Sequence, residues 1–341
     1  MLTEKRAPAA SPAPAAPAAT GAPASLDSLV CHFEGEFRPL SEAKVGVMTH
    51  GFLYGTACFE GIRAYWNEEQ GQLYGLKLLE HYRRLERSAR VLFMDLPATP
   101  AELVDLTADL LRRNGFREDA YVRPSVYKST EAIGVRLHKL DHRFLVFTVP
   151  FGDYIDTTAG ISAQTVSWRR NSDMSIPARS KIVGAYVNSA FAKTEAQLNG
   201  HDEAIVLTLD GHASEGSAEN LFMVRDGKLV TPPLTDDILE GITRASLIEL
   251  AANEMGVETQ SRPIDRSELY IADEVFMCGT GAQISPVIRI DHRPVGTGEV
   301  GPISSRLKDL YFDAVRGRLP RYRHWLTPVY DDSSDGASSG A

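Results

Sequence analysis

Lys181 and Glu215 are the residues whose types and spacing most directly indicate chemistry on amino groups. Lys181 lies between the apolar stretches 176–178 and 182–184, and apolar surroundings favour the neutral lysine amine that forms an imine with a carbonyl group. Glu215 precedes an apolar strand, and its carboxylate could face the far side of a carbonyl cofactor. Each residue alone also fits a structural role, as a surface lysine with a packed stem or as a carboxylate that caps a turn.

Two further segments could bind an anion. Gly241 precedes a helical pattern that starts at Ile242 and Thr243, and the free N–H groups and dipole of a helix N-terminus attract phosphate. The small-residue turn 279–282 also offers backbone N–H groups. Taken alone, an ordinary helix start and an ordinary loop explain the two segments equally well. Tyr186, shortly after Lys181, could reach the same ligand.

The elements that must position these residues are helices interleaved with strands. Thr99 and Glu102 form a capping box with proline at the first helical position, and Gly115 ends that helix. The dipeptide 226–227, Asp-Gly, is a favoured turn between two short strands. The patterns predict helices at 80–92, 100–114, 185–198 and 243–255, and strands at 121–127, 143–150, 204–209, 221–225, 228–231 and 274–278.

The order of these elements favours a mixed α/β fold of the α+β kind. No Gly-x-Gly-x-x-Gly motif follows a first strand, which argues against a Rossmann sheet. At 341 residues the chain is long for one core, so we expect two domains. The expected organisation is a disordered Ala/Pro-rich extension at 1–27, a small N-terminal α/β domain at 28–149, a connection at 150–159, a large domain at 160–330 and a disordered tail at 331–341.

Composition excludes several classes of protein. The net charge of −9, without a Lys/Arg stripe, argues against nucleic-acid and anionic-membrane binding, and no apolar run is long enough for a membrane span. Cys31, Cys58 and Cys278 form no disulfide framework, which favours a reducing compartment, and we expect the cytoplasm. His138 and His142 lack the glutamate of a zinc-protease motif, so no metal site is expected. The prolines of 1–27 argue against a signal peptide.

Several motifs in one order along the chain carry a family resemblance. The segment 215–222 (Glu-Gly-Ser-Ala-Glu-Asn-Leu-Phe) continues to 241–244 (Gly-Ile-Thr-Arg), and Lys181, Tyr186 and the turn 277–280 complete the set. Together they resemble the signature of the class IV aminotransferases, which are pyridoxal-phosphate enzymes of fold type IV. The segments 50–65, 121–124 and 150–154 look like the branched-chain amino-acid aminotransferase branch. The resemblance implies a smaller N-terminal α/β domain and a larger C-terminal domain that carries the cofactor lysine.

The resemblance also implies cofactor roles. Lys181 would form the imine with pyridoxal phosphate and move a proton between the substrate Cα and the cofactor. Glu215 would pair with the pyridine nitrogen and keep it protonated, and Tyr186 would hydrogen-bond the ring hydroxyl. Arg84, rather than its neighbour Arg83, would bind the phosphate. The other implied contacts are Ala218, Glu219, Asn220, Ile242, Thr243 and Thr280, with Glu219 supporting the loop beneath the ring.

Substrate roles follow from the same resemblance. The α-carboxylate would lie at the backbone N–H groups of Thr280, Gly281 and Ala282, near Tyr121, and Arg123 would receive the distal carboxylate of glutamate. The remaining implied contacts of the substrate pocket are Tyr54, Phe59, Gly61, Arg63, Phe151 and Tyr154. Phe151 stands where the family commonly has tryptophan and Gly281 where it commonly has alanine. Both differences would widen the pocket, so the preference among aliphatic amino acids stays open.

The implied activity is ping-pong transfer of an amino group from L-leucine, L-isoleucine or L-valine to 2-oxoglutarate, in a homodimer. Alternatives on the same fold are a D-amino-acid transaminase, an (R)-amine transaminase, an aminodeoxychorismate lyase, and a transaminase for an unusual amino acid of secondary metabolism. The segment 59–63 and Arg123 favour the branched-chain interpretation over the first three. A non-catalytic binding protein of the same fold is a further alternative, which the intact Lys181, Tyr186 and Glu215 disfavour.

Overall fold

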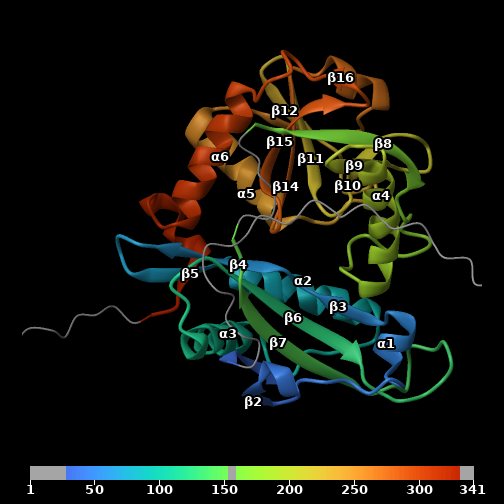
Figure 1. Ribbon diagram of the computed structural model, residues 1–341, viewed down its shortest axis with the longest axis vertical. Coiled ribbons are helices and arrows are strands. Elements are labelled where there is room, and N and C mark those ends of the chain that lie inside the picture. Colours follow the sequence, from blue (N-terminus) through green and yellow to red (C-terminus); the bar gives the residue numbers. More distant parts are fainter. Residues whose placement is uncertain (1–27, 153–158, 331–341) are drawn as a thin grey trace, which may run out of the picture.

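Two β-sheets, each covered by helices, form the part of the chain that the computed structural model describes, residues 28–152 and 159–330 (Figure 1). The first sheet is antiparallel, with the order β17-β5-β4-β6-β7-β1-β2 and β3 paired with β6. Its strands are β1 (Val30–Phe33), β2 (Glu36–Pro39), β3 (Ala57–Phe59), β4 (Ile62–Asn67), β5 (Gln72–Leu76), β6 (Ala120–Lys128), β7 (His142–Pro150) and β17 (Leu326–Pro328). The chain therefore returns to its N-terminal sheet at β17.

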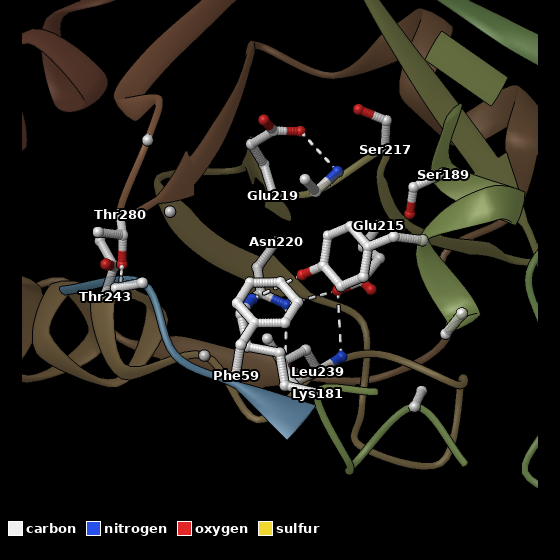
Figure 2. Close-up of a pocket in the computed structure, with 18 of the residues that line it drawn as sticks. Phe59, Lys181, Ser189, Glu215, Ser217, Glu219, Asn220, Leu239, Thr243 and Thr280 are labelled. Atoms are coloured by element: carbon white, nitrogen blue, oxygen red, sulfur yellow. Dashed lines mark hydrogen bonds between the residues drawn. The ribbon is translucent and has the colours of Figure 1, made fainter. Parts of the chain in front are cut away.

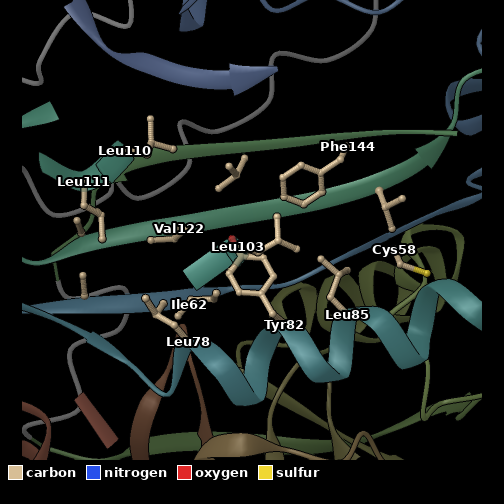
Figure 3. Packing of buried hydrophobic residues seen from close by; sticks show 14 of the residues in the cluster. Cys58, Ile62, Leu78, Tyr82, Leu85, Leu103, Leu110, Leu111, Val122 and Phe144 are labelled. Carbon is tan, nitrogen blue, oxygen red and sulfur yellow. The ribbon is translucent and has the colours of Figure 1, made fainter. Parts of the chain in front are cut away.

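The helices of this half are α1 (His50–Tyr54), α2 (Leu78–Val91) and α3 (Pro100–Asn114). The predicted capping box starts α3, where Thr99 and Glu102 each accept the other's backbone N–H. Gly115 ends the helix with a left-handed φ of 65°. Tyr82 and Leu85 point from α2 toward the strands and pack in the core between sheet and helices (Figure 3).

The α2 helix has a second buried face, because it lies between the two sheets (Figure 1). This face carries His81, Arg84 and Ser88, which follow one another at helical spacing. An N–H of the Arg84 guanidinium donates to the Glu240 carbonyl at 2.7 Å, and the Ser88 hydroxyl accepts the Lys181 N–H at 3.1 Å. Helix α2 thus packs one face into the core of the N-terminal half and makes polar contacts to the C-terminal half with the other face.

The second sheet is mixed and has the order β10-β9-β8-β15-β14-β11-β12-β13, with β16 paired with β15. β8 runs parallel to β9 and β15, and β12 runs parallel to β13. The strands are β8 (Ile161–Arg169), β9 (Glu203–Leu207), β10 (Ala213–Gly216), β11 (Asn220–Arg225), β12 (Lys228–Thr231), β13 (Thr259–Ser261), β14 (Glu274–Gly279), β15 (Gln283–Ile290) and β16 (Arg293–Pro294).

Three helices cover this sheet: α4 (Tyr186–Leu198), α5 (Ile242–Leu250) and α6 (Pro302–Val315). Phe222 and Phe276 stack at 5.0 Å in the core shared with α5 and α6, while Ala192 and Ala196 of α4 pack with Val166. A π-helical turn, Ala251–Met255, extends α5. The 3₁₀ segments are Leu40–Glu42, Val183–Ala185, Arg266–Ile271 and Pro320–Trp325.

The structure confirms the predicted helices and strands, with ends that differ by a few residues. The expected helix at 243–255 is α5 with its π-helical turn. The domain boundaries stay a prediction, and the expected extension at 1–27 and tail at 331–341 lie outside the described residues. Within 28–152 and 159–330, no helix is long and apolar enough to cross a membrane.

Candidate active site

A cavity of about 570 Å³ is lined by residues of both halves, and Lys181 and Glu215 both border it (Figure 2). Most of the predicted site residues meet there. They are Phe59, Gly61, Arg84, Tyr121, Arg123, Phe151, Lys181, Tyr186, Glu215, Ala218, Glu219, Asn220, Ile242, Thr243, Thr280 and Gly281. The cavity therefore depends on how the N-terminal half packs against the C-terminal half.

Lys181 is held through its backbone by the N-terminal half. Its N–H donates to the Ser88 hydroxyl at 3.1 Å, and its carbonyl accepts the Phe59 N–H at 3.1 Å. The next residue, Ile182, forms a β-bridge with Cys58. The Lys181 amine donates to the Tyr186 hydroxyl at 2.7 Å. These contacts fix the backbone and direct the amine into the cavity.

Glu215 presents a carboxylate on the same cavity. It lies in β10, where the pairing with β9 shifts register between Ala213 and Glu215, and it is 3% exposed. Its Oε2 accepts the Asn220 amide at 2.9 Å and the Leu239 N–H at 3.1 Å. Its Oε1 forms an ion pair with Arg170 at 2.5 Å. A register shift of this kind re-aims a side chain, here toward the cavity.

Arg84 is held by a fully buried carboxylate. Its Nε and Nη2 donate to the two oxygens of Glu60 at 2.8 and 2.7 Å, and Glu60 also lies 2.7 Å from the His81 Nδ1. Burial alone would raise the pKa of Glu60, but Arg84 and His81 hold that pKa far below its usual value. Burial lowers the pKa of His81, so the ring is a neutral donor to Glu60. Arg84 thus faces the cavity with a fixed orientation.

The N-terminus of α5 opens beside Arg84. Its cap, Gly241, has no capping side chain, and the first intrahelical bond runs from Ala245 to Gly241. The helix therefore leaves the N–H groups of Ile242 and Thr243 without intrahelical acceptors. A side chain at position 241 would overlap the amide oxygen of Asn220. Figure 2 shows Thr243 on one side of the cavity together with Thr280, opposite Ser189 and Ser217.

Glu219 adds a second carboxyl to the cavity wall. Its Oε2 accepts the Ala218 N–H at 3.0 Å. Burial and the nearby Glu203 raise the pKa of Glu219 to about 8, although Lys193, which pairs with Glu203 at 2.5 Å, opposes the shift. Glu219 is therefore mostly a neutral acid at pH 7, close to the Glu215 side chain.

The opposite wall is aromatic and contains one arginine. Arg123 donates from Nε to the Tyr121 hydroxyl at 2.9 Å, and its guanidinium carbon lies 4.2 Å from the centre of the Phe59 ring. The Tyr121 ring lies 5.1 Å from the Phe151 ring, and burial raises the pKa of the Tyr121 phenol. This wall offers both apolar contact and a cation for a carboxylate.

Among the predicted substrate residues that the structure describes, three do not line the cavity. Arg63 is 1% exposed and uses its guanidinium on four backbone carbonyls, those of Phe151, Gly152, Thr280 and Gly281, at 2.9, 3.1, 2.9 and 3.2 Å. Tyr54 lies on α1, where its hydroxyl accepts the Gly134 N–H. Ala282 is buried beyond Gly281, and Tyr154 lies outside the described residues. The Arg63 bonds favour a role in positioning the 280–281 turn, and these four substrate contacts stay predictions.

Three residues that hold the site were not anticipated from the sequence: Glu60, Ser88 and Arg170. Helical spacing could have indicated Ser88, which follows Arg84 by one turn on α2. Glu60 and Arg170 carry no local signal, because their partners Arg84 and Glu215 lie on other elements.

This geometry defines a class of protein: an enzyme that holds an anionic carbonyl cofactor between a lysine amine and a carboxylate. A family model, amino-transferase class IV, matches residues 57–290. A probable branched-chain-amino-acid aminotransferase from Aquifex aeolicus is 52% identical over 299 residues, which is 88% of this chain and 96% of the relative. The chain belongs to the class IV aminotransferases.

Solved structures agree with this membership. A branched-chain aminotransferase from Thermoproteus uzoniensis with norvaline superposes with a TM-score of 0.85 at 42% identity, covering 89% of this chain and 99% of that one. The branched-chain amino acid aminotransferase from Thermobaculum terrenum in its PLP-form gives 0.86 at 37% identity, with coverage of 90% and 100%. The comparisons confirm the expected family, the mixed α and β fold and pyridoxal phosphate as the cofactor.

The cavity itself fits that cofactor. Arg84 and the open N-terminus of α5 offer positive charge and N–H groups for a phosphate. The Lys181 amine and the Glu215 carboxylate border the same space, which suits an aldehyde and a ring nitrogen of one molecule.

Proposed function

We propose that this enzyme is a branched-chain-amino-acid transaminase, which transfers the amino group of L-leucine, L-isoleucine or L-valine to 2-oxoglutarate. One observation carries the choice of substrates: Arg123, on the aromatic wall of the cavity, lies against the Phe59 ring and donates to the Tyr121 hydroxyl. Such a wall can pack against an aliphatic side chain and can also pair with the distal carboxylate of 2-oxoglutarate. The relatives that are named branched-chain aminotransferases support the same choice.

When bound, pyridoxal phosphate supplies an aldehyde for amino groups and a ring that accepts electrons from the substrate Cα. Lys181 is the amine that we place at the aldehyde, and it is also the base that would take the proton from the substrate Cα and deliver it to the cofactor. Tyr186, 2.7 Å from that amine, orients it. Glu215 holds a proton on the ring nitrogen, while Arg84 and the N–H groups of Ile242 and Thr243 bind the phosphate.

A half-reaction screen tests this function. The cofactor-loaded enzyme is mixed with single L- and D-amino acids and with (R)-1-phenylethylamine, and the loss of the long-wavelength absorbance band is followed. We expect L-leucine, L-isoleucine and L-valine to bleach the band fastest, followed by recovery with 2-oxoglutarate. Faster bleaching by D-alanine or by the amine would assign a different transaminase, and a Lys181→Ala variant that keeps the band would remove the lysine from its role.

The proposal includes a homodimer, formed through an apolar surface that a single chain leaves exposed. Helices α1 and α4 lie on the same side of the molecule, and the Gly184 N–H donates to the Gly55 carbonyl between them (Figure 1). Exposed apolar side chains on and next to these helices are Val47, Phe52, Leu53, Ile133, Val135, Val187 and Phe191. A second copy is the occupant that the family resemblance indicates for such a surface.

Light scattering on a sizing column tests the dimer. We expect the wild-type protein to elute as a dimer and a Phe52→Asp, Val187→Asp double variant as a monomer, because charges would be buried at the contact. Ile271→Asp, at an exposed apolar residue elsewhere, is the matched control and should leave the dimer intact. A monomeric wild-type protein at micromolar concentration would contradict the proposal.

We also place the enzyme in a reducing compartment, the cytoplasm, since Cys31, Cys58 and Cys278 are free and buried.

A further inference from the structure

Arg170 and Arg169 are neighbours with opposite surroundings at the end of β8. The Arg169 guanidinium donates to nearby carbonyls of its own strand, those of Val166 and Ser167, at 3.4 and 3.0 Å. Arg170 instead turns inward, with a side chain that is 12% exposed, and reaches Glu215 at 2.5 Å. Its Nε donates to the Asp237 carbonyl at 3.3 Å, and its backbone N–H donates to the Leu207 carbonyl at 2.8 Å. Arg170 is therefore held by its backbone and by its Nε in addition to the ion pair with Glu215.

Glu215 needs a cation, because a carboxylate that is 3% exposed has lost most of its hydration. Its other two donors, the Asn220 amide and the Leu239 N–H, are neutral and share one oxygen, Oε2. Within residues 28–152 and 159–330, the ion pair that Glu215 forms is with Arg170, through Oε1. After burial and Glu203, the Glu215 charge also contributes to the raised pKa of the adjacent Glu219.

Two other cations near this wall, Lys193 and Arg244, are engaged elsewhere. Lys193 donates to Glu203 at 2.5 Å and to the Asp202 carbonyl at 2.7 Å. The Arg244 guanidinium donates to the Thr231 hydroxyl at 3.1 Å and to the Pro232 carbonyl at 3.2 Å. Neither of them contacts Glu215, so the loss of Arg170 would leave this carboxylate with neutral donors only, among the residues that the structure describes.

We propose that Arg170 is a positioning residue that holds the Glu215 carboxylate by an ion pair and fixes its orientation toward the cofactor's pyridine nitrogen. The inference rests on the proposed function, in which that nitrogen stays protonated during amino-group transfer. Arg170 acts through Glu215, so its effect requires the carboxylate. Without Arg170, the Glu215 carboxylate would lose the ion pair at Oε1 and could rotate, and its hold on a protonated ring nitrogen would weaken.

A double-mutant cycle on cofactor affinity tests this dependence. Cofactor-free wild-type, Arg170→Met, Glu215→Gln and doubly substituted proteins are titrated with pyridoxal phosphate, and quenching of intrinsic fluorescence gives each Kd. We expect Arg170→Met to raise Kd by about 10- to 100-fold in the wild-type background, as for the loss of a charged hydrogen bond. In the Glu215→Gln background the same substitution should raise Kd less than about 3-fold, because its partner is already gone.

Two further variants keep the test decisive. Arg169→Met removes the neighbouring, solvent-facing arginine and should leave Kd and Tm unchanged. Arg170→Lys keeps the charge, and we expect it to recover at least half of the affinity loss on a logarithmic scale. If Arg170→Met does not fold, Arg170→Lys still tests whether cofactor affinity depends on the side chain at position 170. The absorbance spectrum gives a second readout, since Arg170→Met should shift the pH at which the bound cofactor's long-wavelength band changes, whereas Arg169→Met should not.

Several results would overturn the proposal. An unchanged Kd in Arg170→Met means that Glu215 does not need the arginine. An equal rise in Kd in both backgrounds means that Arg170 contacts the cofactor independently of Glu215. A failure of the proposed function is seen in a different measurement, the half-reaction screen. If L-leucine does not bleach the cofactor band, the substrate assignment fails, while the double-mutant cycle on cofactor affinity still tests the role of Arg170. If pyridoxal phosphate does not bind the wild-type protein, both fail together.

Discussion

The buried Glu60–Arg84 ion pair predicts how much of the free energy of unfolding of the cofactor-free protein depends on the Glu60 carboxylate. Glu60 is 0% exposed and receives two hydrogen bonds from Arg84 and one from His81. Glu60→Gln keeps the shape, but it removes the charge and turns one acceptor into a donor that faces the donors of Arg84. Removing one partner of a buried ion pair costs about 3–5 kcal/mol, since the other charge stays buried without compensation. We expect a loss of that size.

Denaturant unfolding of the cofactor-free protein measures this loss at pH 7. Glu240→Gln is the matched control, because the Glu240 side chain is 34% exposed and lies 4.0 Å from Arg87. Its expected change is within about 0.5 kcal/mol. Inorganic phosphate should raise Tm more in Glu60→Gln than in the wild type, since Arg84 then lacks its counter-charge and lies beside the open N-terminus of α5.

The pH dependence of the free energy of unfolding tests whether the Glu60 charge causes this loss. The folded-state pKa of Glu60 is lowered, so its stabilising contribution is present above the ordinary carboxyl pKa of 4.5 and is lost as the pH falls below that value. The stability gap between wild type and Glu60→Gln should therefore be full at pH 7 and shrink in acid. Equal stability at pH 7, or a gap that persists unchanged at low pH, would show that the ion pair does not stabilise the fold.

Three further predictions concern the cavity. Arg123→Met should raise KM for 2-oxoglutarate by about 10- to 100-fold and change the L-leucine half-reaction less, because the charged hydrogen bond serves only the distal carboxylate of 2-oxoglutarate. Steady-state kinetics with both substrates checks this, and equal losses for the two substrates would contradict it. Ser88→Ala should lower kcat more than it changes KM, since the Lys181 N–H loses its buried acceptor, and Ser88→Thr should restore kcat. Glu219 has a raised pKa of about 8, so its contribution is full in acid and is lost as the pH rises from 4.5 through 8. Tm of the cofactor-free protein should therefore fall over this range, and Glu219→Gln should flatten that slope; identical slopes would assign the fall to another group.

The helices and strands were predictable where the signal is local. The α3 helix carries its own start and stop, because the Thr99 capping box and Gly115 satisfy terminal backbone groups within the segment itself. The hairpin of β11 and β12 likewise turns at Asp226-Gly227. Local signals do not report which strands become neighbours, so the pairing of β17 with β5 could not be predicted.

The site was predictable to the extent that motifs mark it. The residues that the family motifs indicate, Lys181, Tyr186 and Glu215, lie on one cavity, while their roles stay predictions. The motifs could not show what holds these residues, since the partners are distant in sequence and are selected by tertiary packing. Arg63 is an example: its type and position suggest a substrate contact, yet its guanidinium spans two chain segments through four backbone carbonyls.

The contacts of Lys181 show that its position in the cavity depends on the packing of the two halves. The lysine follows β8 of the second sheet, but the acceptor for its N–H is Ser88 on α2 and the donor to its carbonyl is Phe59 in the first sheet. The Arg63 side chain, from the first sheet, fixes the 280–281 turn of the second. A shift between the sheets would therefore move the lysine amine relative to Glu215 and the α5 N-terminus, and even a misplacement of about 1 Å can cost about 100-fold in rate. In the proposed function, the buried polar contacts of α2 are thus part of the catalytic geometry, although none of them needs to touch the substrate.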